Sequence, residues 1–245
     1  MTTVVAVTAP EFKKAASVFE SAESLGLKCV SVPDDEAGLV AAIQQHGATH
    51  CIVGVVNYKA ALYDAISKGN VIARFGVGHD GIDKPLATSK GILCSNTPGA
   101  LDDSVAEHVA TLLLGITRQL PQLASEMRAG QWAPRVGQEL RNRTIAVIGC
   151  GPIGRRVARC AAFGFGMRVI GCEIAAVHAA QMQQEFGFEC ITSNFADAVK
   201  HADYVSLHIP SIPATKHFIN ATSLAHMPKN SILINTGTLL TVNTL

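Results

Sequence analysis

The sequence predicts an α/β protein with two doubly wound parallel sheets. Short apolar or β-branched runs alternate with helical stretches from the start of the 245-residue chain. This alternation breaks once, at residues 96–99, where a long amphipathic helix follows, and it resumes after Trp132 and Pro134. Strands that alternate with helices pair in parallel, because each helix carries the chain back to the same end of the sheet. One sheet is therefore expected on each side of the break.

The first half of the chain predicts five strands joined by helices. The strands are apolar or β-branched runs at residues 4–7, 28–32, 50–55, 71–75 and 92–94. The helices are the stretches between them, at residues 11–25, 34–45, 59–67 and 82–90. We assign residues 1–98 to a first domain on this pattern.

The second half opens with the long helix, which runs from about Asp102 towards Gln119. Five further strands are predicted at residues 144–148, 168–172, 189–191, 204–207 and 231–235. We assign residues 99–245 to a second domain with a sheet of its own.

Composition limits the class of protein. Apolar residues make up 48% of the chain and charged residues 16%, which is typical of a globular α/β protein and excludes a disordered or fibrous one. The net charge is +1 and the basic residues are dispersed, so we expect no nucleic-acid partner. No apolar run approaches the length of a membrane span, and we expect no membrane association. The seven cysteines occur singly, without CxxC spacing or a signal peptide, so we expect no metal site and a cytoplasmic location.

A glycine-rich turn follows the strand at residues 144–148 and indicates a dinucleotide cofactor. Gly149 allows a tight turn, Gly151 allows the backbone to approach a pyrophosphate, and Gly154 allows close packing of helix on strand. The pyrophosphate would lie at the helix N-terminus, where unpaired N–H groups attract an anion. Glu173 closes the next strand, nineteen residues after Gly154. A carboxylate there accepts both hydroxyls of the adenosine ribose and repels a 2′-phosphate, so NAD is favoured over NADP.

Two nearby features are ambiguous. Residues 76–81 match the same Gly-x-Gly-x-x-Gly pattern, but Pro85 interrupts the helix that follows and no carboxylate ends the next strand, so we do not predict a nucleotide loop there. Cys150 lies inside the second glycine turn, where the helix dipole could activate its thiol towards oxidation. Packing in the core is the favoured interpretation of Cys150.

Several motifs occur together in the order found in one enzyme family. They are Gly76-Val77-Gly78-His79-Asp80-Gly81-Ile82-Asp83, Gly91-Ile92, Asn96-Thr97-Pro98-Gly99, Ser104-Val105-Ala106-Glu107-His108, Asp203-Tyr204-Val205-Ser206-Leu207-His208-Ile209-Pro210, Pro213-Ala214-Thr215, Met227-Pro228-Lys229 and Ile232-Leu233-Ile234-Asn235-Thr236. From about residue 71 onward the chain therefore resembles the D-isomer-specific 2-hydroxyacid dehydrogenases, a family that includes phosphoglycerate dehydrogenases and glyoxylate or hydroxypyruvate reductases. The first seventy residues fit the flavodoxin-like substrate domain of that family in pattern only, and the second domain corresponds to its Rossmann NAD-binding domain.

The resemblance implies a substrate site in the first domain. Backbone N–H groups of Val77 and Gly78 would bind the carboxylate of a small 2-hydroxy or 2-oxo acid, in the cleft between the domains. The alternative is a simple turn.

The resemblance also implies further contacts to NAD in the second domain. Those residues are Pro152 and Ile153 at the pyrophosphate, Ile209 and Pro210 at the adenosine, and Thr236 and Gly237 at the nicotinamide. For Ile209 and Pro210, a core strand that ends in a turn accounts for the sequence equally well.

The sequence departs from the family where catalysis is expected. Thr238 stands where the family has the arginine that binds the substrate carboxylate, and Leu239 stands where a glycine usually follows. The catalytic Glu and His of the family would lie beyond residue 245, so we expect a C-terminally truncated chain with no catalytic residue assigned. His79, His108 and His208 are the candidate replacements, and His79 is the best placed, but structural roles are favoured for all three.

Three hypotheses remain from the sequence. The chain is an impaired NAD-dependent 2-hydroxyacid dehydrogenase, a non-catalytic NAD(H)-binding sensor of the same fold, or a fragment that does not fold stably. The long helix carries apolar residues on neighbouring faces, and the resemblance leads us to expect a homodimer through it, with an interdomain core helix as the alternative. Without the returning C-terminal segment, apolar surface would be open on both domains.

Overall fold

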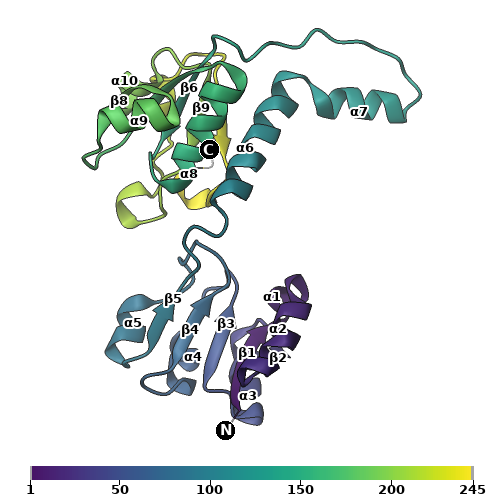
Figure 1. The fold of residues 1–245 in the computed structure, drawn as a ribbon, viewed down its shortest axis with the longest axis vertical. Helices are drawn as coiled ribbons and strands as arrows, with labels where there is room; N and C mark the ends of the chain where they lie inside the picture. The colour runs from purple at the N-terminus through teal and green to yellow at the C-terminus, as the bar shows by residue number, and fades with distance from the viewer. Residues whose placement is uncertain (1, 244–245) are drawn as a thin grey trace. The chain divides into compact units, whose positions relative to one another are not determined.

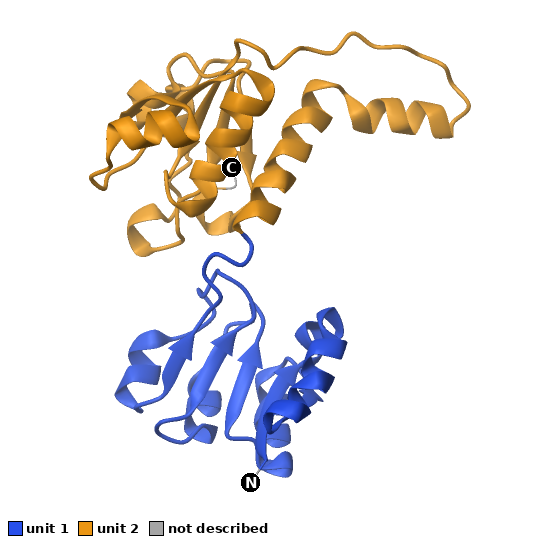
Figure 2. Cartoon of the chain, viewed as in Figure 1, with its two compact units in different colours: residues 1–101 blue, residues 102–245 orange. Residues whose placement is uncertain are grey.

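A computed structural model of the chain describes residues 2–243, and it contains two parallel sheets of five strands each, both covered by helices (Figure 1). The residues fall into two compact units, Met1–Leu101 and Asp102–Leu245 (Figure 2). The predicted fold class, two doubly wound parallel-sheet domains, is confirmed. Each unit has a sheet and a core of its own.

Unit 1 contains a parallel sheet in the order β2-β1-β3-β4-β5. Its strands are β1 Thr3–Thr8, β2 Leu27–Val32, β3 His50–Val53, β4 Val71–Arg74 and β5 Leu93–Ser95. Its helices are α1 Ala9–Lys14, α2 Ala16–Ser21, α3 Glu36–His46, α4 Ala60–Ala65 and α5 Lys84–Ser89, with a 3₁₀ turn at Ala22–Leu25. Asp35 caps α3 by accepting a hydrogen bond from Gly38 N, and Asp83 caps α5 by accepting one from Leu86 N.

The single helix predicted at residues 11–25 is wrong, because two short helices and a 3₁₀ turn occupy this stretch. Ala15 leaves the helical region, with φ −143° and ψ 40°, and its N–H bonds to the carbonyl of Phe12. The break lets the ring of Phe12 stack on that of Phe19, with 5.5 Å between centroids. Phe19 also packs against Phe75, so aromatic packing overrides the helical pattern.

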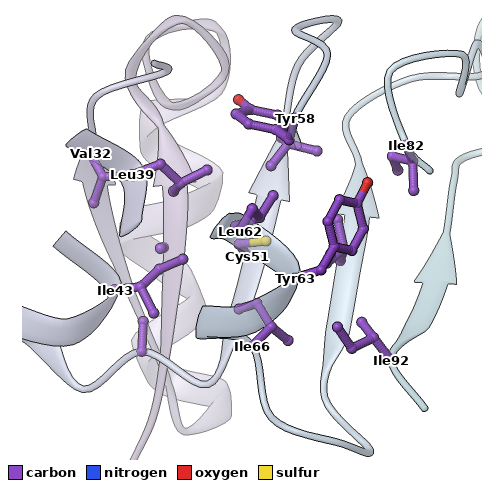
Figure 3. Packing of buried hydrophobic residues seen from close by; sticks show 14 of the residues in the cluster. Val32, Leu39, Ile43, Cys51, Tyr58, Leu62, Tyr63, Ile66, Ile82 and Ile92 are labelled. Atoms are coloured by element: carbon purple, nitrogen blue, oxygen red, sulfur yellow. The ribbon is translucent and has the colours of Figure 1, made fainter. Parts of the chain in front are cut away.

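The core of unit 1 lies between the sheet and the helices that cover one of its faces. Figure 3 shows Leu39, Leu62 and Tyr63 in this cluster, and all three side chains are buried. The hydroxyl of Tyr63 accepts a hydrogen bond of 2.7 Å from the N–H of Asp83, so this polar atom in the core has a partner. The contact also fixes the chain just before α5.

Unit 2 contains a parallel sheet in the order β10-β9-β6-β7-β8. Its strands are β6 Thr144–Ile148, β7 Arg168–Cys172, β8 Phe188–Thr192, β9 Tyr204–Leu207 and β10 Ile232–Asn235. Its helices are α6 Asp102–Thr117, α7 Leu120–Arg128, α8 Pro152–Arg159, α9 Ala179–Phe186, α10 Phe195–Val199 and α11 Ala221–Ala225. A π-helical turn at Cys160–Gly164 follows α8, and 3₁₀ turns lie at Pro213–Thr215 and Leu239–Thr241.

The central strand β6 is buried on both faces. Ile145 and Val147 contribute to one hydrophobic cluster, and Ala146 and Ile148 contribute to a second cluster. Successive side chains of a strand point to opposite faces, so this alternation places one cluster on each side of the sheet. A continuous apolar run is therefore the expected sequence of such a strand.

The long helix α6 is shorter than predicted and divides its apolar residues between two environments. It ends at Thr117, because Gln119 adopts the left-handed conformation, with φ 55°, before α7 begins. Val109 and Leu113 are buried against the sheet of the same unit, whereas Leu114 and Ile116 are exposed. In Figure 1, α7 projects away from that sheet, and none of its residues is buried.

Within residues 2–243, no helix is both long and apolar enough to cross a bilayer.

Candidate functional site

The topology of unit 2 creates a binding position at one edge of its sheet. The chain passes from β6 to β7 on one side, and it later enters β9 on the other side of β6. The helices that follow β6 and β9 therefore diverge, which leaves a crevice at the carboxyl ends of these two strands. Gly149 lies directly after β6, and His208 directly after β9.

Packing explains two of the three glycines in the turn after β6. Gly149 has φ +92°, and a Cβ at this residue would lie 2.5 Å from the carbonyl oxygen of His208. A Cβ at Gly154 would collide with the carbonyl oxygen of Gly149. Any side chain at either position would force two backbone segments apart. Both glycines are thus required by the protein itself.

Gly151 serves no such packing purpose within the protein. Its φ of −72° and ψ of −170° are accessible to any residue, and a Cβ there would meet no atom within 4 Å. The open space lies at the N-terminus of α8, where Gly151 is the N-cap residue. Glycine at this position leaves room for a group from outside the chain. These residues therefore fit the pyrophosphate of a dinucleotide.

The first turn of α8 supplies the donors for such an anion. Pro152 has no N–H. Within residues 2–243, the backbone N–H groups of Gly151 and of Ile153 onward have no acceptor in the protein until the helical ladder begins with Arg155 N bonded to Gly151 O at 2.9 Å. The positive end of the helix dipole also favours an anion here. Pro152 is exposed and Ile153 is half-buried.

Glu173 lies immediately after β7 and is held by two backbone donors. Its Oε2 accepts a hydrogen bond from Cys150 N at 2.9 Å, and its Oε1 accepts one from Ala175 N at 3.0 Å. An ionised carboxylate has about four acceptor positions, so room remains for the two hydroxyls of a ribose. The link to Cys150 also joins the carboxylate to the glycine turn, a contact that the sequence did not predict.

The segments after β9 and β10 complete this edge of the sheet. Ile209 packs on a hydrophobic cluster of the sheet, while Pro210 is exposed. Thr236 and Gly237 follow β10, and Gly237 N donates to Asn235 Oδ1 at 3.0 Å. All four residues follow the carboxyl ends of their strands, as the sequence predicted.

Thr238 is engaged in a local turn. Its hydroxyl accepts a hydrogen bond from Leu240 N at 3.3 Å, and its carbonyl accepts hydrogen bonds from Asn235 Nδ2 and Thr241 Oγ1. The position at which an arginine was expected therefore caps the 3₁₀ turn at Leu239–Thr241. Its short side chain reaches no further than its own turn.

Unit 1 carries the first glycine turn, residues 76–81, at the carboxyl end of β4. Gly76 has φ +139°, which only glycine adopts readily, whereas a Cβ at Gly78 would meet no atom within 4 Å. Asn96, whose role the motif alone did not predict, donates a hydrogen bond of 2.8 Å to the carbonyl of Val77. This bond fixes the backbone of the loop.

A cavity of about 210 Å³ opens beside the first glycine turn, residues 76–81. It is lined by His79, Ile82, Lys84, Cys94, Ser95 and Asn96. Asn96 thus connects the loop to the cavity wall. Nothing in the sequence pattern predicted a cavity here, because its wall comes from two separate strand ends and α5.

The three histidines lie in different environments. His79 is exposed, and its Nδ1 lies 3.0 Å from Lys84 Nζ. His108 is exposed on α6. His208 Nε2 lies 2.8 Å from Ser206 Oγ, and burial lowers the pKa of His208 to about 4, so its imidazole is neutral at physiological pH. A neutral ring so hard to protonate is poorly suited to exchange protons near pH 7.

Cys150 is buried behind the glycine turn. Burial, and after it the negative charge of the Glu173 carboxylate, raise the pKa of its thiol to about 12. Activation of this thiol by the helix dipole is therefore wrong, and the favoured interpretation as a packing residue holds. Its Sγ also lies where a side chain at Gly171 would have to go, since a Cβ there would be 2.8 Å away.

Comparisons with known proteins agree on one family. Residues 110–244 match the model of "D-isomer specific 2-hydroxyacid dehydrogenase, NAD binding domain". The D-3-phosphoglycerate dehydrogenase of Methanocaldococcus jannaschii is 37% identical over 70% of this chain and 33% of its own length. The glyoxylate reductase of Thermococcus litoralis is 34% identical over 72% of this chain and 54% of its own length. The match thus spans about half or less of these relatives.

A solved structure agrees as well. The D-lactate dehydrogenase of Aquifex aeolicus, complexed with NAD and lactic acid, superimposes with a TM-score of 0.82 at 26% identity, covering 98% of this chain and 70% of that one. The likeness extends over both units and includes the first seventy residues, where the sequence offered only a pattern.

We predict that the thiol of Cys150 is inert in the native protein. Because its pKa is raised, it stays protonated at about pH 8, near the ordinary thiol pKa, whereas the side chain of Cys190 is exposed. Alkylation with iodoacetamide followed by mass spectrometry should modify Cys190 and leave Cys150 unmodified until the chain is denatured. Labelling of both at equal rates would contradict the burial of Cys150.

Proposed function

The chain belongs to the D-isomer specific 2-hydroxyacid dehydrogenase family, with NAD as its cofactor, and from that premise we propose that it binds a small 2-hydroxy or 2-oxo acid and is impaired in hydride transfer. NAD carries hydride between its nicotinamide C4 and C2 of such an acid. The observation that carries cofactor binding is the open space at Gly151, where a Cβ would meet no atom within 4 Å.

In this proposal each segment at the edge of the unit 2 sheet binds one part of NAD. Gly151, Pro152 and Ile153 border the pyrophosphate, and Glu173 accepts the ribose hydroxyls. Ile209 and Pro210 border the adenosine, while Thr236 and Gly237 border the nicotinamide. The two carboxylate hydrogen bonds that already hold Glu173 support this role, because they fix its orientation before the cofactor arrives.

The acid binds at the turn after β4. The backbone N–H groups of Val77 and Gly78 receive its carboxylate, and Asn96 holds the loop in shape through the carbonyl of Val77. Gly78 supports this assignment by the same reasoning as Gly151, since a side chain there would meet nothing within the protein.

Thr238 is the reason to propose impaired turnover. An arginine would bind the substrate carboxylate through two parallel hydrogen bonds and polarise the reacting carbonyl. A threonine has neither the reach nor the charge, and the hydroxyl of Thr238 already accepts from Leu240 N. The same observation favours the second candidate, an NAD(H)-binding sensor or interaction protein that binds the cofactor without chemistry.

A second copy of the chain is the proposed partner. The part of unit 2 from α6 through the segment after α7 exposes a series of large apolar side chains, at Leu114, Ile116, Leu120, Met127, Trp132 and Val136. Single exposed apolar residues are common on protein surfaces, but a series of them in one segment indicates an interaction surface, and a homodimer would cover it. We propose a cytoplasmic location, because a reducing compartment suits the seven free cysteines.

We predict that Gly151→Ala weakens NADH binding without destabilising the protein. The added methyl group meets no protein atom but occupies the approach of the pyrophosphate, and overpacking of this kind should raise the Kd at least about 10-fold. NADH fluorescence titration and thermal melting measure the two effects. Gly115→Ala in α6 is the matched control, since a Cβ there is also unobstructed. Equal affinity in both variants would remove Gly151 from the cofactor site.

We predict that the wild-type chain binds NADH but reduces glyoxylate, hydroxypyruvate and pyruvate slowly. Thr238→Arg should lower the Kd of oxamate, an unreactive 2-oxo acid analogue, by about 10-fold in the presence of NADH, because it restores a charged hydrogen-bond donor. Thr222→Arg on α11 adds the same charge at an exposed position and should leave the Kd unchanged. Rapid turnover by the wild type would overturn the proposed impairment.

We predict a dimer that depends on the apolar surface of α6 and α7. Light scattering should give twice the mass of the chain for the wild type and a monomer for Leu120→Asp, which places a charge on that surface. Leu25→Asp in unit 1 has a comparably exposed side chain, 79% against 58%, and should remain dimeric. A wild-type monomer at micromolar concentration would exclude this partner.

A further inference from the structure

Both polar backbone atoms of Cys150 form hydrogen bonds with side chains of the same unit, Glu173 and Arg155. Its N–H donates to Glu173 Oε2 at 2.9 Å, and its carbonyl accepts from Arg155 Nε at 2.9 Å. The two side chains carry opposite charges, and each binds one of the two polar backbone atoms of this residue. The middle of the glycine turn is thus clamped without any ligand.

Arg155 itself is held in place by aromatic packing. It lies on α8, is half-buried, and its guanidinium carbon lies 5.7 Å from the centroid of the Phe186 ring at the end of α9. Stacking of this kind restricts the guanidinium plane. Its neighbour Arg156 instead pairs with Asp102 and Asp103 of α6. In the part of the chain that the structure describes, Arg155 forms no ion pair, so its principal polar contact is the carbonyl oxygen of Cys150.

The contact determines where the next N–H points. The peptide between Cys150 and Gly151 is planar and trans, so its carbonyl and its N–H point in opposite directions. With the carbonyl of Cys150 turned towards Arg155, the N–H of Gly151 faces the opposite side. Within residues 2–243, that N–H donates to no acceptor in the protein.

Glycine at position 151 makes this peptide easier to rotate, because the peptide plane turns through ψ of Cys150 and φ of Gly151. Glycine has few steric limits on φ and ψ, so the peptide plane could turn over at little cost if nothing held it. A rotated peptide would direct the carbonyl oxygen of Cys150 towards the phosphate and repel it. A fixed donor also avoids the entropy of ordering the turn when the ligand binds.

We propose that Arg155 is a positioning residue for cofactor binding, which holds the Cys150–Gly151 peptide so that the Gly151 N–H faces the pyrophosphate. Its Nε hydrogen bond is the operative feature, and its positive charge is secondary. The inference concerns cofactor binding and does not depend on whether the chain turns over a substrate.

The test compares variants that separate the hydrogen bond from the charge. Arg155→Met removes both, whereas Arg155→Gln removes the charge but places an N–H donor at the position of the arginine Nε. Arg159→Met removes the same charge from an exposed residue of the same helix. The ligands are NADH and ADP, which carry a pyrophosphate, and adenosine, which does not.

The expected result is a pattern across variants and ligands. Loss of a hydrogen bond from a charged donor should raise the Kd of NADH and ADP about 10-fold in R155M, with R155Q within about threefold of the wild type and R159M unchanged. The Kd of adenosine, followed by ligand-observed NMR, should not change in any variant. The loss in R155M should persist at high salt, since it does not arise from long-range attraction.

Three outcomes would overturn the proposal. The first is that R155M binds ADP as tightly as R159M does. The second is that R155Q binds ADP as weakly as R155M does. The third is that R155M loses as much affinity for adenosine as for ADP, which would indicate general damage to unit 2.

Far-UV circular dichroism checks that each variant folds. Should R155M not fold, Phe186→Leu takes its place, because it keeps the charge but removes the ring under the guanidinium. It should weaken ADP binding about threefold, and an affinity equal to the wild type's would overturn the proposal.

Discussion

The architecture of the cofactor site depends on one close approach between backbone segments. The chain leaving β6 passes so near the chain leaving β9 that Gly149 has no room for a side chain beside the carbonyl of His208. Gly154 then packs α8 directly on Gly149, which fixes where the N-terminus of that helix lies. With two of the three glycines required for this contact, the third is left facing open space. The site is therefore a consequence of how tightly the centre of the sheet is built.

The two glycine motifs share a pattern but differ in their physical role. In the first motif, a Cβ at Gly81 would meet the carbonyl oxygen of Val56 at 2.5 Å, so packing also requires a glycine there. The helix that follows, α5, begins only at Lys84, beyond the motif, whereas α8 begins inside its own motif at Pro152. A helix N-terminus within the turn is what suits a pyrophosphate. The first turn offers only loop N–H groups, which suit a smaller carboxylate.

The sequence predicted β6 well because its residues are buried on both faces, and short continuous apolar runs between turn residues are typical of such strands. The edge strand β5 is exposed at all three residues, and its predicted bounds, 92–94, are one residue too early. The prediction failed at Ala15, where packing of three phenylalanine rings decides the backbone, and at Gln119, where one residue in the left-handed conformation ends α6. Glu173 was predicted from its spacing. The hydrogen bond from Cys150 N to Glu173 could not be predicted, because it depends on how the folded turn meets the next strand. The contact of Arg155 with the turn could not be predicted either, because an arginine on a helix usually faces solvent.

The strand order of unit 2 has a consequence for how the chain is made. β6 is the centre of the sheet, yet both strands that flank it are synthesised later, β7 at residues 168–172 and β9 at residues 204–207. During synthesis, this continuously apolar strand leaves the ribosome with both edges unpaired, and one edge stays open until most of the unit has been translated. Such an edge is a template for pairing with other nascent chains. The same apolar residues that bury β6 on both faces of the finished sheet are thus an aggregation hazard until its neighbouring strands have been made.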